Sequence, residues 1–450
     1  MLLGTPNRGW LVIAGVAIVL FAVMFKPWIH GDDGVRYFAY LRSAVIDGDL
    51  DFRDEFEHYR DEARDVMRAD PATGRIANAT PCGSAVMWAP WFLAAHAGVK
   101  VARLAGATVA ADGYAKPYVI AVCFGSFFYA LAGLFLLYGS LRRWFARAAS
   151  LTAVMGVWLA SPLVFYMYAH PSMSHANSFF CASALLYVCA RWGRSSSFSA
   201  WAGMGALAGL GMLVRYDGVL WALAPAATWA ALLYEKRSSA LRLLALGVVC
   251  AACAVIVFSP QMMAWKYMHG SFFSGPKDFK LARDLGVWTS PHFRDVLFSG
   301  RRGVFFWMPI AWLGAAGWAM RSPVPVPLRA VAPVIFLLNA WMVGGWVMWW
   351  AGASFGPRFF VSHLPLFAFG IAAVMSRFSA RGQKVAIGVV VLLIVWNFGL
   401  MAQYALRMID REGDLSRREV IMNQWRVPGE VLGRAGDILG RASGNDSGLH

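Results

Sequence analysis

Residues 117–138 read PYVIAVCFGSFFYALAGLFLLY, and this uninterrupted apolar stretch decides the class of protein. A helix of this length matches the ~30 Å hydrocarbon core of a lipid bilayer. Backbone polar groups inside lipid must find their hydrogen bonds within the segment itself, so a helix is the expected form. The stretch therefore predicts a membrane-spanning helix.

Comparable apolar stretches recur along the whole chain. Of the 450 residues, 59% are hydrophobic and 15% are charged, whereas soluble domains contain about 25% charged residues. We therefore expect an all-α, polytopic transmembrane helical bundle with about eleven spans. The predicted spans lie near residues 9–25, 117–138, 149–168, 174–190, 199–214, 218–234, 241–259, 303–320, 330–348, 359–376 and 385–403.

Basic residues are concentrated in alternate short loops between these spans. With the N-terminus in the cytoplasm, these loops and the N-terminal segment hold fourteen Lys and Arg residues and one acidic residue, Glu235. Cytoplasmic loops of membrane proteins carry such an excess of basic residues. The pattern predicts a multi-pass membrane protein, with loops 26–116 and 260–302 and the polar tail 404–450 on the side away from the cytoplasm. The net charge of +16 follows from this topology and does not indicate nucleic-acid binding.

Three segments outside the spans have distinct patterns. Residues 85–99 form a short apolar run that contains Pro90 and His96, and we expect a re-entrant or interfacial helix there. Residues 47–70 combine many charges with apolar residues at every third or fourth position, which predicts an amphipathic helix on a membrane or another domain; the alternative is a solvated linker helix. The chain ends in RASGNDSGLH, a polar stretch that we expect to be disordered.

Ionisable side chains at the outer ends of the spans are the candidate functional residues, because charge near lipid is costly unless it serves a purpose. They gather on the predicted outer side, which favours an enzyme with an outward cavity. A carrier would place its polar groups near the bilayer midplane. The candidates are Asp32, Asp33, His170, His175, Arg215, Asp217, Lys277 and Arg358.

Each of these residues has a structural alternative. Asp32 or Asp33 is a general base, a metal ligand or the N-cap of a helix. Arg215 is either a phosphate contact or the partner of Asp217 in an internal ion pair. Arg358 is either part of an anion site or an anchor at the membrane interface.

The remaining candidates have weaker patterns. Lys277 lies in a Gly-Pro-rich loop and is either an anion contact or solvated. His170 and His175 are candidate substrate or metal contacts, but their spacing is not that of a zinc site. No cofactor is required by the sequence, and a divalent metal held by the aspartates and a histidine stays an alternative.

Four stretches resemble the GT-C membrane glycosyltransferases, in particular bacterial relatives of the dolichyl-phosphate-mannose protein mannosyltransferases and the aminoarabinose lipid A transferases. They are DDGVRYFAYLRSAVIDGDLDF (32–52), NATPCGSAVMWAPWFLAAH (78–96), GMLVRYDG (211–218) and SFGPRFF (354–360). The order of these elements resembles the family over most of residues 9–376. Thr80-Pro81-Cys82 replaces the family's Lys-Pro-Pro or His-Pro-Pro, and Trp349-Trp350 is not followed by the Asp-Tyr-Gly of oligosaccharyltransferases.

The resemblance implies a GT-C fold in residues 1–403 and transfer of a sugar from a polyprenyl-phosphate donor. The acceptor would be a hydroxyl on an envelope glycan, a lipid or a protein. Asp33 aligns with the family's catalytic aspartate, with Asp32 beside it, and Arg215, Lys277 and Arg358 would hold the donor phosphate. The alternatives are a flippase or transporter of lipid-linked glycans and a non-enzymatic assembly protein of the envelope.

Overall fold

The computed structural model describes residues 8–61, 67, 69–236, 238–274 and 289–443. The helices of the first half are α1 (Arg8–Met24), α2 (Asp32–Arg42), η1 (Ser43–Asp47), α3 (Arg53–His58), α4 (Gly83–Leu104), α5 (Lys116–Leu141), α6 (Arg147–Leu159), η2 (Phe165–Ala169), α7 (His175–Trp192) and α8 (Phe198–Val214). Those of the second half are η3 (Tyr216–Ala222), α9 (Leu223–Tyr234), α10 (Ala240–His269), α12 (Phe293–Phe298), α13 (Val304–Trp307), α14 (Ile310–Trp318), α15 (Val326–Gly344), η5 (Arg358–His363), α16 (Leu364–Met375), α17 (Ala380–Ala405) and α18 (Arg417–Ser443).

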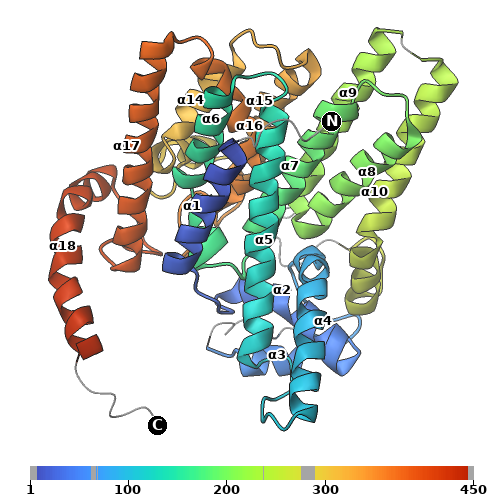
Figure 1. Cartoon of the computed structure of the whole chain (residues 1–450). Coiled ribbons are helices and arrows are strands. Elements are labelled where there is room, and N and C mark those ends of the chain that lie inside the picture. Colours follow the sequence, from blue (N-terminus) through green and yellow to red (C-terminus); the bar gives the residue numbers. More distant parts are fainter. Residues whose placement is uncertain (1–7, 62–66, 68, 237, 275–288, 444–450) are drawn as a thin grey trace.

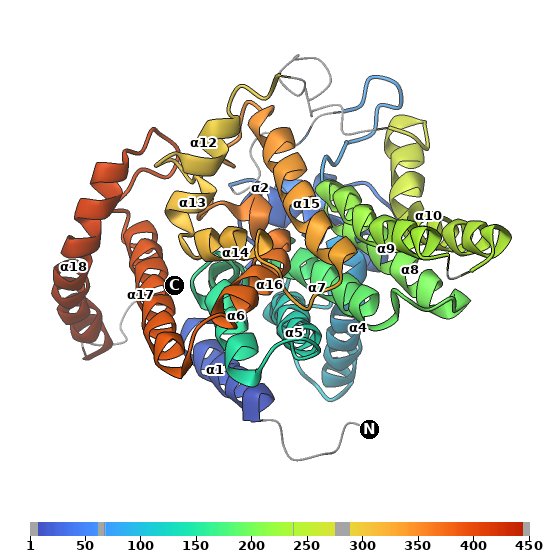
Figure 2. The same ribbon diagram turned by 90° about the horizontal axis from the view of Figure 1, so that it is seen from above.

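The chain is an all-helical bundle, as the apolar stretches predict (Figure 1). Every predicted span contains at least one of these helices. Among the described residues, 5 helices are long and apolar enough to cross a membrane: α5, α10, α15, the η5–α16 unit and α17. The helices are therefore confirmed, while the number that cross the bilayer stays a prediction. Figure 2 shows the bundle from above, with α7 in its interior and α17 and α18 along one edge.

Glycines allow neighbouring helices of the bundle to pack closely. A Cβ atom on Gly205 of α8 would lie 2.0 Å from the carbonyl oxygen of Cys250 in α10. A Cβ atom on Gly317 of α14 would lie 1.9 Å from the carbonyl oxygen of Gly370 in α16. Small residues at such crossings are typical of helices that associate inside membranes, where close van der Waals contact supplies much of the attraction.

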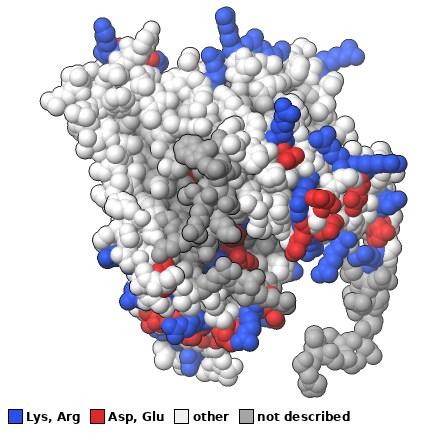
Figure 3. Space-filling model, turned by 180° about the vertical axis from the view of Figure 1, so that it is seen from behind, with Lys and Arg blue, Asp and Glu red and all other residues white. Residues whose placement is uncertain are grey.

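Charged side chains mark the two ends of the bundle. In Figure 3 the upper end carries mainly Lys and Arg, both signs of charge gather at the lower end, and the surface between them on the left is largely uncharged. Apolar residues are also exposed on α10 and α17, among them Val255, Ile256, Leu392 and Val395. An uncharged band between charged ends is the surface that a bilayer requires.

The predicted amphipathic helix over residues 47–70 is wrong in extent. Among the described residues of this stretch there is one short helix, α3, and the chain turns at Gly48 with φ of 78° before it begins. Phe52 and Phe56 are buried, so these two apolar side chains pack inside the protein instead of on a membrane. Residues 62–66 and 68 lie outside the described residues, and Ala69 pairs with Ile76 in an isolated β-bridge.

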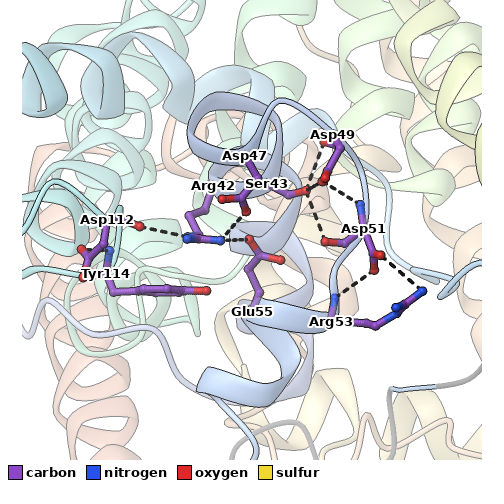
Figure 4. Close-up of polar contacts among 9 residues, drawn as sticks. All are labelled: Arg42, Ser43, Asp47, Asp49, Asp51, Arg53, Glu55, Asp112 and Tyr114. Carbon is purple, nitrogen blue, oxygen red and sulfur yellow. Dashed lines mark hydrogen bonds and ion pairs between the residues drawn. The ribbon is translucent and has the colours of Figure 1, made fainter.

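The first outer loop is held together by Arg42, which ends α2 (Figure 4). Its Nη1 atom lies 2.9 Å from Glu55 Oε1 and also contacts Asp47, while its Nε donates to the Asp112 carbonyl at 2.9 Å. The ring of Tyr114 lies 4.3 Å from the guanidinium carbon. Burial raises the pKa of Glu55 to about 7 although Arg42 opposes this shift. These contacts join α2 to α3 and to the segment before α5, and they fix the helix whose first residues enter the candidate site.

Residues 85–99 lie within α4, which continues through Pro90 and is longer than the predicted apolar run. It is not among the 5 described helices that meet the length and hydropathy of a span. Figure 1 shows α4 beside the lower part of α5 and reaching beyond its end. Whether α4 re-enters the bilayer or lies at its interface stays a prediction.

The predicted polar tail also differs from the structure. Residues 417–443 form helix α18, because apolar residues recur there at helical spacing. The end of the stretch expected to be disordered, residues 444–450, lies outside the described residues.

The orientation of the bundle can be tested with two exposed serines. Ser199 lies in the first turn of α8, at the predicted cytoplasmic end of a span, and Ser271 follows α10 on the predicted outer side. We expect Ser271→Cys to react with an impermeant thiol reagent in intact cells and Ser199→Cys to react only after permeabilisation. Labelling of Ser199→Cys but not of Ser271→Cys in intact cells would reverse the topology.

Candidate active site at one end of the bundle

Four segments that are distant in sequence meet at the predicted outer end of the bundle. They are the first turn of α2, the turn before α7, the connection between α8 and η3, and the start of η5. Asp33 Oδ2 of α2 lies 2.8 Å from Arg358 Nη1 of η5. Arg215 Nη1 donates to Ser174 Oγ at 3.4 Å, and the Ser174 hydroxyl donates to the hydroxyl of Tyr37 at 2.9 Å. These contacts bring three of the candidate residues into one polar cluster.

Helix α2 begins in a way that leaves both aspartates available. Its N-cap is Gly31, with φ of 73° and no side-chain capping bond, so neither Asp32 nor Asp33 is the cap. Both occupy the first turn, where the helix dipole stabilises negative charge. A Cβ atom on Gly34 would lie 2.9 Å from Ser172 Oγ. Gly34 therefore lets α2 approach the turn before α7.

The two neighbouring aspartates have opposite electrostatic environments. Burial acts to raise the pKa of Asp33, but Arg358, Arg36 and Arg215 outweigh it and the pKa is lowered. For Asp32, burial and the charge of Asp33 outweigh Arg36, and the pKa is raised although 55% of the side chain is exposed. The three guanidiniums dominate the field at Asp33, so its pKa is lowered despite its burial and the neighbouring Asp32. Asp33 is ionised at neutral pH.

Arg215 forms the ion pair with Asp217 that the sequence allowed as one alternative. Arg215 Nε lies 3.0 Å from Asp217 Oδ1, and both side chains are largely buried. They line a small cavity together with Ser178, Trp221 and Ser362. The volume of this cavity that is open to the centre of a water molecule is about 10 Å³. That is room for about one water molecule. The pairing with Asp217 leaves the Nη1 side of Arg215 directed toward Ser174, on the side of Asp33.

The two candidate histidines differ in their contacts. His170 Nε2 donates to the carbonyl of His30 at 2.9 Å, which ties the turn before α7 to the segment before α2. His175 is fully buried against Tyr166, with ring centroids 4.5 Å apart, and neither of its ring nitrogens has a hydrogen-bond partner within the described chain. No group of three or more His, Cys, Asp or Glu side chains suited to a metal ion occurs among the described residues.

Lys277 lies outside the described residues, so its place in the predicted phosphate site stays a prediction. Arg302 is a further arginine at this end of the bundle to which the sequence assigned no role; it is buried and adopts φ of 66°. Arg302 Nε donates to the Ser354 carbonyl at 2.6 Å, and its Nη2 donates to the Arg411 carbonyl. Tyr166 supports the same turn, since its hydroxyl donates to the Phe355 carbonyl at 2.9 Å. Both residues fix the turn that presents Arg358, but neither stands near it in sequence.

The chain is similar to known proteins in part of its sequence and in its fold. The family model described as Dolichyl-phosphate-mannose-protein mannosyltransferase matches residues 118–265. ArnT from Cupriavidus metallidurans bound to undecaprenyl phosphate has a similar structure, with a TM-score of 0.53 and 16% identity over 95% of this chain and 76% of ArnT. The apo state of ArnT from Cupriavidus metallidurans has a TM-score of 0.50 and 17% identity, over 95% of this chain and 75% of ArnT. The apo form of the Archaeoglobus fulgidus oligosaccharyltransferase has a TM-score of 0.44 and 13% identity, over 94% of this chain and 54% of that protein. Comparison with curated protein sequences gives no match.

The helical bundle has the fold of the GT-C membrane glycosyltransferases, which it shares with the ArnT structures. Residues 118–265 are also similar to the family model of the dolichyl-phosphate-mannose protein mannosyltransferases.

Proposed function

We propose that this protein transfers a sugar from a polyprenyl-phosphate donor to a hydroxyl group of an envelope glycan, lipid or protein. The transfer takes place on the periplasmic side of a bacterial inner membrane. The observation that carries the proposal is the ion pair of Asp33 with Arg358, with Arg215 close to the same carboxylate. A carboxylate beside two guanidiniums supplies both parts that glycosyl transfer from a lipid phosphate needs. The shared fold with an ArnT structure that binds undecaprenyl phosphate supports the class of donor.

The reaction assigns one role to each charged group. Asp33 accepts the proton of the acceptor hydroxyl as its oxygen attacks the anomeric carbon of the sugar. The bond from that carbon to the phosphate oxygen breaks, and the lipid phosphate leaves with the electron pair. Arg358 and Arg215 stabilise the departing phosphate, because guanidinium groups bind phosphate oxygens through two parallel hydrogen bonds.

The ion pair between base and cation gives the site an order of events. In the ligand-free protein the guanidinium of Arg358 lowers the pKa of Asp33 and makes it a weak base. A donor phosphate that binds Arg358 would offset part of this positive field. The pKa of Asp33 would then rise toward its ordinary value, so donor binding would prepare the base for the acceptor.

The test is turnover by the purified full-length protein in lipid vesicles, with radiolabelled polyprenyl-phosphate hexoses and pentoses and an envelope extract as acceptor. We expect sugar to reach the acceptor while free polyprenyl phosphate accumulates in equal amount. Movement of the intact lipid-linked sugar between leaflets, with no cleavage of the sugar–phosphate bond, would instead identify a transporter. The absence of both cleavage and movement with every donor would contradict the proposal and would favour an assembly protein.

A further inference from the structure

Helix α18 packs on the second half of α17 through one narrow face. Gln403 Nε2 of α17 donates to the Val420 carbonyl at 3.1 Å, and Gln424 Nε2 of α18 donates to the Trp396 carbonyl at 3.0 Å. Val420 is fully buried in this contact. Asn423, on the same face, donates to the Met408 carbonyl at 2.9 Å. These contacts fix which side of α18 is covered by the bundle.

A second face of α18 is apolar and exposed. Ile421, Trp425 and Leu432 follow one another at intervals of four and seven residues, which places them on one side of an α-helix. The side chains of Trp425 and Leu432 are 81% and 75% exposed. The remaining side carries Glu419, Arg426, Glu430 and Arg434. A helix with separate apolar and charged sides is suited to a boundary between lipid and water.

The place of α18 in the molecule indicates what covers the apolar face. Figures 1 and 2 both show α18 at the edge of the bundle beside α17. α17 is one of the helices apolar enough to cross the membrane, and its residues Leu392 and Val395 are exposed on the surface that would meet lipid. The contact of Gln424 with the Trp396 carbonyl brings α18 beside the stretch of α17 that exposes Val395. Tryptophan is enriched at this level of membrane proteins.

We propose that α18 is an interfacial membrane helix whose face formed by Ile421, Trp425 and Leu432 lies in the phospholipid of the leaflet next to the candidate site. Its basic side chains then stay among the lipid headgroups. This proposal concerns the surface of the molecule and does not depend on glycosyl transfer.

Lipid binding by α18 would also steady the candidate site. The segment 406–416 leads from α17 to α18 and contacts the turn before α13. The Arg411 carbonyl accepts a hydrogen bond from Arg302, and Arg301 Nη1 lies 3.2 Å from Asp414 Oδ1. Arg417 of α18 donates to the Phe298 carbonyl at 2.5 Å. A helix fixed in the leaflet would hold this segment against Arg302, which supports the turn that presents Arg358.

Spin labels on the full-length protein test the proposal directly. Trp425→Cys and Leu432→Cys place labels on the apolar face, and Arg426→Cys and Glu430→Cys are matched controls on the charged face of the same helix. The six native cysteines are replaced in this background, and each variant is reconstituted in vesicles of zwitterionic and anionic phospholipid. We expect labels at 425 and 432 to be several-fold more accessible to oxygen than to a water-soluble nickel chelate. The controls should show the reverse order.

Equal access of the nickel chelate to all four labels would overturn the proposal, because the helix would then lie in water. Dipolar broadening at 425 and 432 that disappears on dilution with unlabelled protein would also overturn it, since a second copy would cover the face. A measurement without labels guards against misfolded variants. Trypsin should cleave at Arg426 and Arg434 several-fold faster in a Trp425→Glu, Leu432→Glu double variant than in wild type or Glu430→Gln. Equally fast cleavage of the wild type in vesicles would contradict membrane binding.

Discussion

Asp33→Asn is expected to lower turnover by about 10²–10⁴-fold, which is the usual effect of removing a general base. Asparagine keeps the size of the side chain, but it cannot accept the proton of the acceptor hydroxyl. Asp32→Asn should have a milder effect, because Asp32 is half-exposed and pairs with Arg36 rather than with Arg358. Turnover with the cognate donor and acceptor is the measurement, with donor binding measured separately.

The ion pair with Arg358 requires a second readout for Asp33→Asn. Removing one partner of a buried pair leaves the other charge uncompensated and destabilises the protein. The Asp33 side chain is 31% exposed, so solvent screens part of this effect. The Asp33→Asn, Arg358→Gln double variant separates stability from turnover. Its thermal stability should recover relative to Asp33→Asn, because no uncompensated charge remains, while its turnover should stay low, because both the base and a phosphate contact are missing. Recovery of turnover in the double variant, or a fully active Asp33→Asn protein, would remove the assignment.

The hydropathy pattern was sufficient to predict the helices, because each apolar stretch specifies its own helix through local backbone hydrogen bonding. It failed where burial depends on partners elsewhere. Residues 47–70 have helical spacing, yet Phe52 and Phe56 are buried against other parts of the first loop and the helix is short. Residues 417–443 looked polar by composition, but the apolar face of α18 is visible only once the docked face is known.

The residue types of the candidate site were predictable, and the pair of Arg215 and Asp217, two residues apart, was among the alternatives that the sequence offered. Asp33, Arg215 and Arg358 were identified from their positions at span ends. The contact of Asp33 with Arg358 depends on how distant helices pack, and no local pattern carries that information. The contacts of Arg302 depend on packing in the same way, because its partners, Ser354 and Arg411, are 52 and 109 residues away. An arginine pair in a loop has no distinctive spacing.

Arg358→Lys is expected to weaken catalysis by about 1–3 kcal/mol, or roughly 5–150-fold, although the positive charge is kept. One nitrogen of Arg358, Nη1, is used by Asp33, and its Nε is buried without a partner in the described chain. A planar guanidinium can bind a carboxylate on one edge and a phosphate on another at the same time. The ammonium of lysine is a single point of charge and cannot serve both with the same geometry.

The measurement separates donor KM from turnover for Arg358→Lys, with Arg215→Lys as the parallel variant and Arg143→Lys at the opposite end as the control. Because Arg215 is also committed to Asp217, its replacement should mainly raise the donor KM. Arg358 contacts the base directly, so its replacement should lower turnover as well. If both variants keep the donor KM and turnover of the wild type, these arginines do not hold the donor phosphate. Asp33 would then need another cation, and Lys277 would be the next residue to replace.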